Sequence, residues 1–453
     1  MKRLSLVTVS MIALLAAPAL AQQAAPVIEQ HSVAGHIGFL AGEELRGRGS
    51  ATHDEAVAAA YVAAQFRIAG LTTVPGMDSH FQRAPLIKST PSGTASLTVG
   101  DVVAQQGGDL TLLSRAVTPV SGPFAVAAGT DPADIPTADI VLITPAGGQG
   151  VSAQLMAARQ KGAKLIVVRA TEELAGMVSR GATGPSYRLA DTPVRGGAAM
   201  VMLAAEAFDR IAAAGGSIAF DPGQSLDEAA VTTNAMGWLQ GTDPAAGVLL
   251  ISAHLDHVGV RPDGTIMYGA NDDGSGTVAV IELAHALAAM GPHKRSIMFA
   301  AYGAEEVGLL GSRYFVDNPP IPLTDIAANL EIEMIGDQDP QLPPGVMMMT
   351  GFERSDFGPA LKERGALVGP DPYPEQNFFQ RSDNYALALK GIVAHTISGW
   401  ATIPTYHTVN DTIENLNIPF MTAAIQSLVE PLAQMADGEF TPEWAEGGRP
   451  EPR

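Results

Sequence analysis

Residues 230–437 alternate short apolar runs with longer helical segments, and this alternation restricts the fold more than any other feature of the chain. The apolar runs read GVLLISA, RSIMFAAY, AANLEIEMI and GIVAHTIS; the helical segments read TVAVIELAHALAAM, VGLLGSRYFV and FMTAAIQSLVEPLAQMA. Such alternation is typical of a mainly parallel sheet with helices on both faces. We therefore predict an α/β fold of three α/β/α layers with a mostly parallel mixed sheet, in which ligands bind at the carboxyl ends of the strands.

Histidines and carboxylates occur where these strands end. Five successive strand ends supply at least one such residue, and the residues are His254 and Asp256, Asp272 and Asp273, Glu305 and Glu306, Glu331 and Glu333, and His407. The two aspartates lie in the glycine-rich turn YGANDDGSG, which opens a helix. Because the carboxyl ends of parallel strands share one edge of the sheet, we expect these side chains to lie close together.

Each of these residues, taken alone, has a simpler structural explanation. A single His at a strand end is more often hydrogen-bonded or solvated than a metal ligand, and an acidic pair before a helix usually caps that helix. Glu333 is harder to explain in this way, because a carboxylate in a buried strand costs several kcal/mol unless it is paired, protonated or bound to a cation. The convergence of five strand ends favours a metal site.

The ligand types and their number indicate two metal ions. The chain has no Cys, so His and carboxylates must hold any metal. Zinc takes about four such ligands, with one position left to water in a hydrolytic site. Five candidate groups are too many for one ion but suit two ions that share a carboxylate; they are His254, Asp272 as the bridge, Glu306, His407 and either Glu333 or Glu331.

Glu305 is left without a metal role in this scheme. It is placed to act as a general base and then as a general acid. The motif HExxH is absent from the chain, which excludes the single-zinc design in which a helix carries both histidines. His257 is expected to flank the site without binding metal.

Six motifs in this order resemble metallopeptidase family 28, the dizinc exopeptidases that include secreted bacterial aminopeptidases. The motifs are SAHLDHVG, YGANDDGSGT, AYGAEEVGLLGS, NLEIEMIG, RSDNYAL and PTYHTVNDT. The resemblance covers residues 230–437 and, more loosely, 31–80, where LAGEELRGRGS is similar to the family's opening. The His-free region 113–228 resembles a protease-associated domain through TADIVLI and AARQKGAKLIVV, and we expect a smaller, β-rich α+β insert there.

The resemblance implies a role for each candidate ligand. It implies that His254 and the acid before MIG hold one zinc ion, that Glu306 and His407 hold the other, and that Asp272 bridges the two. The family usually has Asp before MIG, whereas this chain has Glu333, with Glu331 as the alternative ligand. The peptide bond after the bridging Asp is often cis in this family.

The resemblance also implies roles around the ions. Glu305 becomes the catalytic base, and Asp256 the carboxylate that orients His254. Tyr406 is placed to donate a hydrogen bond to the oxyanion of the tetrahedral intermediate, and Arg381 falls where the family often has a substrate-contacting residue.

The chain termini complete the predicted organisation. Lys2 and Arg3 precede an apolar run and the residues ALA at 19–21, which predicts a signal peptide at 1–21 and an exported protein, with a membrane anchor as the alternative. We expect the peptidase parts at 22–112 and 229–437, the insert at 113–228, and a polar, loosely held tail at 438–453.

The charge balance narrows the possible partners. Lys and Arg total 27 against 47 Asp and Glu, which argues against nucleic acids and anionic membranes as partners. We predict an exported zinc exopeptidase with two zinc ions per chain, most simply an aminopeptidase acting on peptides, with an insert that contacts substrate or a partner protein. Carboxypeptidase, dipeptidase and glutaminyl-cyclase activities remain alternatives, as does an inert binding protein.

Overall fold

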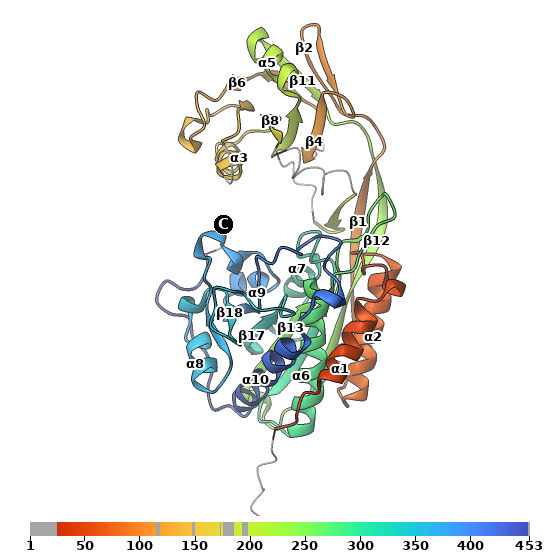
Figure 1. The fold of residues 1–453 in the computed structure, drawn as a ribbon, viewed down its shortest axis with the longest axis vertical. Helices are drawn as coiled ribbons and strands as arrows, with labels where there is room; N and C mark the ends of the chain where they lie inside the picture. The colour runs from red at the N-terminus through yellow and green to blue at the C-terminus, as the bar shows by residue number, and fades with distance from the viewer. Residues whose placement is uncertain are drawn as a thin grey trace, which may run out of the picture.

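A nine-stranded mixed sheet forms the centre of the larger part of the molecule (Figure 1). The computed structural model describes residues 25–114, 118–146, 150–172, 174, 185–192 and 198–451. In spatial order the strands are β19 (Val368–Pro370), β18 (Met347–Met349), β20 (Ala394–Ser398), β17 (Ile326–Ile332), β13 (Val248–His254), β16 (Ser296–Tyr302), β12 (Ser225–Leu239), β1 (Phe81–Pro91) and β9 (Ser186–Leu189). Strands β20, β17, β13 and β16 pair in parallel at the centre, which confirms the predicted α/β class.

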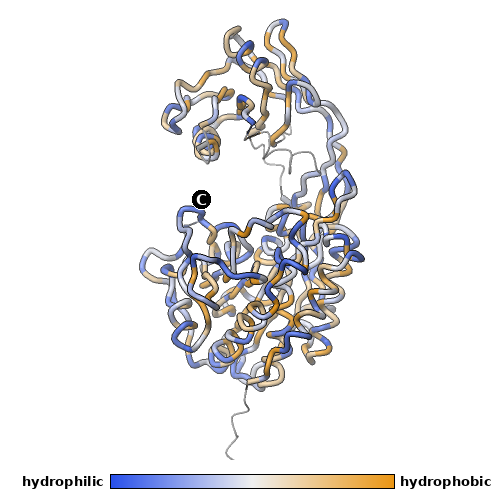
Figure 2. Tube along the Cα trace, viewed as in Figure 1, coloured by the Kyte–Doolittle hydropathy of each residue, from blue (hydrophilic) through white to orange (hydrophobic). Residues whose placement is uncertain are grey.

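Helices cover both faces of this sheet, because its central strands bury side chains on both. Leu249 and Ile251 of β13 enter one core, and Leu250 between them enters the other. The first core is closed by α1 (Gln30–Leu40), α2 (His53–Ile68), α6 (Gly276–Met290), α8 (Phe357–Glu363) and α10 (Ile418–Ala436), and the second by α7 (Leu310–Asp317) and α9 (Asn384–Lys390). Figure 2 shows hydrophobic stretches inside this body and hydrophilic loops around it.

The order of the parallel strands creates a switch point at β13. The chain runs from β13 through α6 to β16 on one side of β13, and then through α7 to β17 on its other side. Since α6 and α7 pack on opposite faces, the loops that follow these strands diverge at their carboxyl ends. The predicted ligands follow β13, β16, β17 and β20, so the topology brings them to the edge where a ligand is expected.

Two smaller sheets form a second module, which Figure 1 shows at the far end of the long strands β1 and β12. These strands pair from Phe81 with Ala235 to Pro91 with Ser225. The module consists of β4 (Leu110–Ser114), β10 (Ala199–Leu203), β8 (Leu165–Arg169), β7 (Ile140–Ile143) and β6 (Ala125–Val126) in one sheet, β3 (Val102–Gln105), β2 (Ser96–Val99), β11 (Ser217–Asp221) and β5 (Val120–Pro123) in the other, and α3 (Gly150–Gln160) and α5 (Ala205–Ala214). A shared core, with Leu97, Leu142 and Phe220 among its members, joins the two sheets.

The strand pairing bears on where this module begins. Strands β2, β3 and β4 lie in its sheets, although the sequence placed residues up to 112 with the larger part. Strand β9, inside the expected insert at 113–228, pairs instead with β1 at the edge of the nine-stranded sheet. We propose that the module begins near residue 92 and ends near residue 224, where β1 ends and β12 begins.

The C-terminal segment is packed against the larger part, so the expectation of a loosely held tail is wrong for residues 438–451. The Trp444 indole donates a hydrogen bond to the carbonyl of Gly391 at 3.0 Å and packs near Phe379 in the second core. The buried Arg295 guanidinium donates to the carbonyl of Phe440 at 2.8 Å and to the Thr441 hydroxyl. The tail's few apolar side chains hold it in place.

The structure describes neither the predicted signal peptide nor any helix suited to span a membrane. The predicted signal peptide at 1–21 lies outside the described residues. Among the helices of the described ranges, none has both the length and the apolar character that a membrane span requires.

His395 of β20 is a fully buried histidine in the core of the larger part. Its Nδ1 lies 2.9 Å from the carbonyl of Thr350 and its Nε2 lies 2.8 Å from the Ser355 hydroxyl. Burial lowers the pKa of His395 from 6.5 to about 4, because the protonated ring would lose its hydration. The folded state therefore holds a neutral ring, whereas the unfolded chain takes up a proton below about pH 6.5.

This difference predicts that His395 makes the protein less stable as the pH falls from about 6.5 to about 4. A pKa difference of this size corresponds to about 3 kcal/mol of folding stability. This stability is fully present above about pH 6.5 and is lost by about pH 4. In thermal unfolding at pH 7.5 and pH 5, His395→Gln should show a smaller drop in midpoint than the parent protein. The exposed His53→Gln is the control, and an equal drop in all three proteins would refute this role.

Candidate metal centre

His254 ends strand β13 and presents one ring nitrogen to the site. The side chain is fully buried, and its Nδ1 lies 3.2 Å from the backbone carbonyl of Asp256, which fixes the proton on Nδ1. The Nε2 atom then carries a free lone pair. It lies 3.4 Å from Asp272 Oδ1, 3.8 Å from Glu333 Oε1 and 3.9 Å from Glu305 Oε2, with no hydrogen-bond partner among the described residues.

Asp272 lies between the two predicted ligand groups. Its carboxylate is buried, with Oδ1 directed at His254 and Oδ2 3.1 Å from His407 Nε2. Burial alone would raise the pKa of Asp272, but the close approach of the two histidines holds it well below the usual range. The peptide bond from Asp272 to Asp273 is cis, as the resemblance implied. The structure therefore places a charged carboxylate where the bridge was predicted.

Two further aspartates hold the turn that carries Asp272. The Asp273 carboxylate accepts the backbone N–H of Gly276 at 2.9 Å and of Met334 at 3.0 Å, and so ties this turn to the end of β17. The Asp411 carboxylate accepts the N–H of Asn271 at 2.7 Å and of Asp272 at 3.1 Å. Asp411 was not singled out from the sequence, although it lies in PTYHTVND, close to His407.

Asp256 holds the loop after β16 as well as lying beside His254. Its carboxylate accepts the N–H of Glu305 at 3.0 Å and of Glu306 at 3.4 Å, and the Ser50 hydroxyl donates to it at 2.5 Å. By contrast, its Oδ1 is 3.9 Å from His254 Nδ1, whose nearer neighbour is the Asp256 carbonyl. The carboxylate that the resemblance assigned to orienting His254 therefore positions the two glutamates in this structure.

The two glutamates of this loop face different neighbours. Glu306 Oε2 lies 3.0 Å from His407 Nε2. Burial and the charge of Asp272 would raise the pKa of Glu306, but its close contacts with His257 and His407 hold it below its usual range. Glu305 contacts His254 only distantly. Burial first, and then the charges of Glu306, Asp383 and Glu333, raise the pKa of Glu305 well above its usual range. One glutamate is thus a candidate ligand and the other a candidate proton carrier.

His407 and Tyr406 close the site from the loop after β20. Burial lowers the pKa of His407, but its contacts with the Asp272 and Glu306 carboxylates outweigh this effect and raise it to about 10. The Tyr406 ring stacks on the His407 ring at 3.9 Å. Burial and the nearby carboxylates raise the pKa of Tyr406 above its usual range, so its phenol remains a proton donor.

The structure separates the two glutamates of β17. Glu333 lies just past the end of the strand and reaches toward His254, with 19% of its side chain exposed. Glu331 is fully buried and accepts a hydrogen bond from the Ser252 hydroxyl. Since Glu331 belongs to neither group of potential metal ligands among the described residues, the geometry favours Glu333 as the ligand.

Two overlapping groups of side chains can each hold a metal ion, and they share Asp272. The first consists of His254, Asp272 and Glu333, and the second of His257, Asp272, Glu306 and His407; within each, the potential ligand atoms lie within 4.8 Å of one another. Several of these buried atoms have no hydrogen-bond partner within the described part of the chain, namely His254 Nε2, both ring nitrogens of His257 and Asp272 Oδ2. Unpaired buried lone pairs that converge in this way fit metal ligation.

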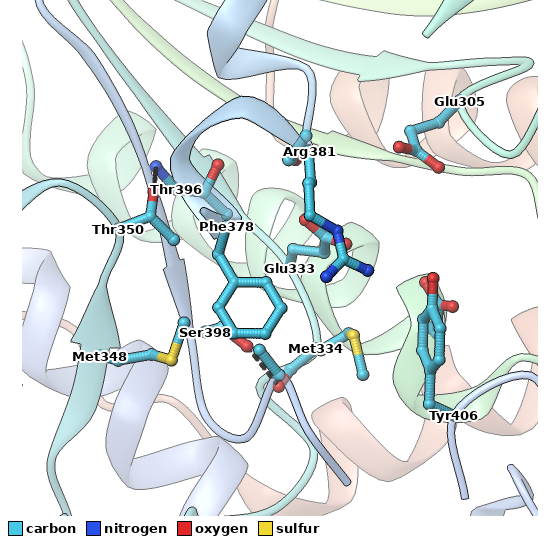
Figure 3. Close-up of a pocket in the computed structure, with 13 residues that line it drawn as sticks. Glu305, Glu333, Met334, Met348, Thr350, Phe378, Arg381, Thr396, Ser398 and Tyr406 are labelled. Carbon is cyan, nitrogen blue, oxygen red and sulfur yellow. Dashed lines mark hydrogen bonds between the residues drawn. The ribbon is translucent and has the colours of Figure 1, made fainter. Parts of the chain in front are cut away.

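A pocket opens beside this centre, lined by Glu305, Glu333 and Tyr406 on one side (Figure 3). Phe378 and Met348 line the apolar part of the pocket. Figure 3 shows the Arg381 side chain extending toward Glu333 and Tyr406, and its guanidinium lies 4.9 Å from the Phe378 ring centre. Arg381, which the resemblance implied as a substrate contact, thus lines this pocket.

Arg48 is the buried cation beneath the site. Its guanidinium is fully buried and donates to four backbone carbonyls, at 2.8 Å to Leu255, 2.6 Å to Leu40, 2.9 Å to Tyr268 and 2.7 Å to Gly269. These bonds join the loop after β13 to the glycine-rich turn that carries Asp272. Arg48 lies in LAGEELRGRGS, which the sequence identified only as similar to the family's opening.

The fold and the side chains define a three-layer α/β protein with a buried His and carboxylate centre suited to two metal ions. Residues 234–430 match the sequence model of peptidase family M28. Leupeptin-inactivating enzyme 1 of Streptomyces exfoliatus is 33% identical over 201 residues, covering 39% of this chain and 42% of that protein. Aminopeptidase YwaD of Bacillus subtilis is 39% identical over 90 residues, covering 20% of this chain and 18% of that protein. The matched parts thus span less than half of either relative.

Solved structures share the architecture. An aminopeptidase from Aneurinibacillus sp. strain AM-1 superimposes with a TM-score of 0.60 at 18% identity, covering 90% of this chain and 94% of that one. BSAP, a zinc aminopeptidase from Bacillus subtilis, gives a TM-score of 0.56 at 18% identity, covering 92% and 97%. Over residues 234–430 the chain is similar to peptidase family M28, which confirms the resemblance that its motifs predicted.

The position of Arg48 predicts a large loss of stability when the guanidinium is removed. Arg48→Ala removes four hydrogen bonds to backbone carbonyls, most of them buried, and should lower the free energy of unfolding by about 4 kcal/mol. This loss should appear as a fall of roughly 5 to 10 °C in the thermal midpoint. Arg46→Ala is the matched control. Like Arg48, Arg46 has a positive φ, but its side chain is exposed and makes a long surface ion pair of 3.8 Å with Asp54. Equal midpoints for the two variants would contradict the prediction.

Proposed function

We propose that the protein is a zinc-dependent aminopeptidase that removes amino-terminal residues from peptides. The observation that carries the proposal is the pair of ligand groups that share Asp272, with Glu305 beside them and outside both. This arrangement separates ligands from a proton carrier, as a hydrolytic two-metal site requires. The names of the relatives, among them a zinc aminopeptidase from Bacillus subtilis, support the choice of metal and reaction.

The side chains divide the work of peptide hydrolysis. Two zinc ions, when bound, would polarise the scissile carbonyl and make a water molecule more acidic. Glu305 takes the proton from the attacking water and returns it to the amine as the C–N bond breaks. A carboxyl group whose pKa is raised by burial can both accept and return that proton near neutral pH.

Tyr406 and the carboxylates position the substrate. The Tyr406 phenol, which its surroundings keep protonated, donates to the carbonyl oxygen as negative charge develops there. The pocket places Glu305 and Glu333 where a free α-ammonium group would be attracted. The substrate's first side chain would then enter the part lined by Phe378 and Met348, which favours an uncharged, apolar residue.

Arg381 supports a second candidate function. Its guanidinium lies in the same pocket, and a planar cation suits a carboxylate ligand. A carboxypeptidase would use it to bind the free carboxyl terminus of the substrate. The two candidates therefore differ in which end of the peptide must be free.

Export and the role of the second module remain proposals. We propose that residues 1–21 direct export. We also propose that the module formed by the two smaller sheets contacts the substrate or a partner protein.

The proposed function predicts that hydrolysis requires a free amino group and a bound metal. Aminoacyl anilides with an apolar first residue should be cut, and their N-acetylated forms about 100-fold more slowly, because a charge-assisted contact is lost. A chelator should abolish the reaction and added zinc should restore it. Equal cutting of blocked substrates would reject the aminopeptidase assignment, and a preference for a free carboxyl terminus would favour the carboxypeptidase.

Glu305→Gln is the matched inactive variant in this assay. It should lower kcat by about 100- to 10,000-fold and leave the zinc content unchanged, because Glu305 transfers protons and is not a ligand. Full activity in this variant would refute the role of Glu305 in proton transfer.

The adjacent aspartates predict unequal effects of the same substitution. Asp272→Asn removes the shared charged ligand and should abolish both activity and the binding of two ions. Asp273→Asn should be tolerated, because one amide oxygen still accepts the two short bonds from Gly276 and Met334 and only the 3.3 Å bond from the His254 N–H is lost. Zinc content and kcat/KM measured on both variants check this, and similar losses in the two would refute it.

A further inference from the structure

His257 is a fully buried histidine in the loop after β13, and neither of its ring nitrogens has a hydrogen-bond partner among the described residues. An unpaired buried imidazole is costly unless something outside the chain binds it. The sequence offered no sign of this, because His257 follows Asp256 in HLDH and was expected to flank the site. The surroundings of its ring, and not its spacing in the sequence, indicate that His257 is a candidate metal ligand.

The backbone holds the segment that carries His257 in place. The His257 N–H donates to the carbonyl of Arg48 at 3.1 Å, and His257 forms an isolated bridge with Gly49. On the other side of the ring lies Gly269, where an added Cβ would come within 2.4 Å of His257 Cγ. The backbone contacts therefore fix the segment that carries His257, and the close approach of Gly269 limits the room beside its ring.

The ring points at the second ligand group. His257 Nδ1 lies 2.7 Å from Glu306 Oε1 and 3.7 Å from Asp272 Oδ2, and its ring stands edge-on to the His407 ring at 5.5 Å. The approach to Glu306 is short but does not form a hydrogen bond. A free imidazole nitrogen aimed at two carboxylates and a second imidazole has the chemistry of a zinc ligand.

We propose that His257 binds the zinc ion held by Asp272, Glu306 and His407, as the fourth protein ligand of that ion. The two metal positions are then unequal. Resting on the proposed zinc function, this inference gives one position two imidazoles and two carboxylates, from His257, His407, Asp272 and Glu306. The other position has one imidazole and two carboxylates, from His254, Asp272 and Glu333. The four-ligand position should hold zinc more tightly and fill first, and the three-ligand position is the one left more open to water and substrate.

Zinc retention across a chelator series tests the inference without reference to activity. The full chain should lose one ion at low chelator concentration and the second only at much higher concentration. His257→Gln should weaken the tighter position by about 100-fold or more, because loss even of a residue that only supports a ligand costs 10- to 100-fold. His285→Gln is the matched control, since His285 also has a buried unpaired ring nitrogen but lies in α6 outside both ligand groups.

A second variant separates ligation from folding. The chain contains no Cys, so in His257→Cys loaded with cobalt(II) any thiolate-to-cobalt charge-transfer absorption reports on position 257 alone. That absorption, together with tighter retention than in His257→Gln, is the expected result. Unchanged retention in His257→Gln, or no such absorption in a folded, cobalt-loaded His257→Cys, would overturn the inference. Zinc retained in two steps by a protein that cuts no peptide would instead refute the proposed function alone.

Discussion

The repulsion among carboxylates buried at one sheet edge is the constraint that organises this molecule. Asp256, Asp272, Asp273, Glu305 and Glu306 all lie there with little or no access to water. In such surroundings every carboxylate needs a compensating partner. The structure supplies three kinds of partner, which are backbone N–H groups, histidines and the buried guanidinium of Arg48.

The backbone partners explain why the loops hold their shape without regular pairing. Asp256 accepts two N–H groups of the loop after β16, Asp273 accepts one from its own turn and one from the loop after β17, and Asp411 accepts two from the turn that carries Asp272. Arg48 binds the carbonyl groups on the opposite side of the same segments. Asp256, Asp273 and Asp411 therefore hold together the loops that carry the candidate ligands.

The sequence predicted the parts of this arrangement that depend on chain order. Runs of apolar residues predicted β13, β16, β17 and β20, and the residues after them supplied the candidate ligands, because parallel strands bring their carboxyl ends to one edge. Three features depend instead on contacts between distant segments, and the pattern did not reveal them. His257 becomes a candidate ligand through its buried position beside Glu306 and Asp272, the Asp256 carboxylate binds the backbone of Glu305 and Glu306, and the tail is held by Trp444 and by the bonds of Arg295.

The choice between Glu331 and Glu333 illustrates the same limit and its resolution. Period-two alternation placed both glutamates on one face, but β17 ends at Ile332, and the backbone beyond it is fixed from two sides. The Glu333 N–H bonds the carbonyl of Ile397, and the Met334 N–H bonds Asp273, each at 3.0 Å. Because the main chain cannot advance toward His254, the reach of the carboxylate depends on the length of the side chain. The extra methylene of Glu relative to Asp is thus the means by which this chain brings a charge to that position.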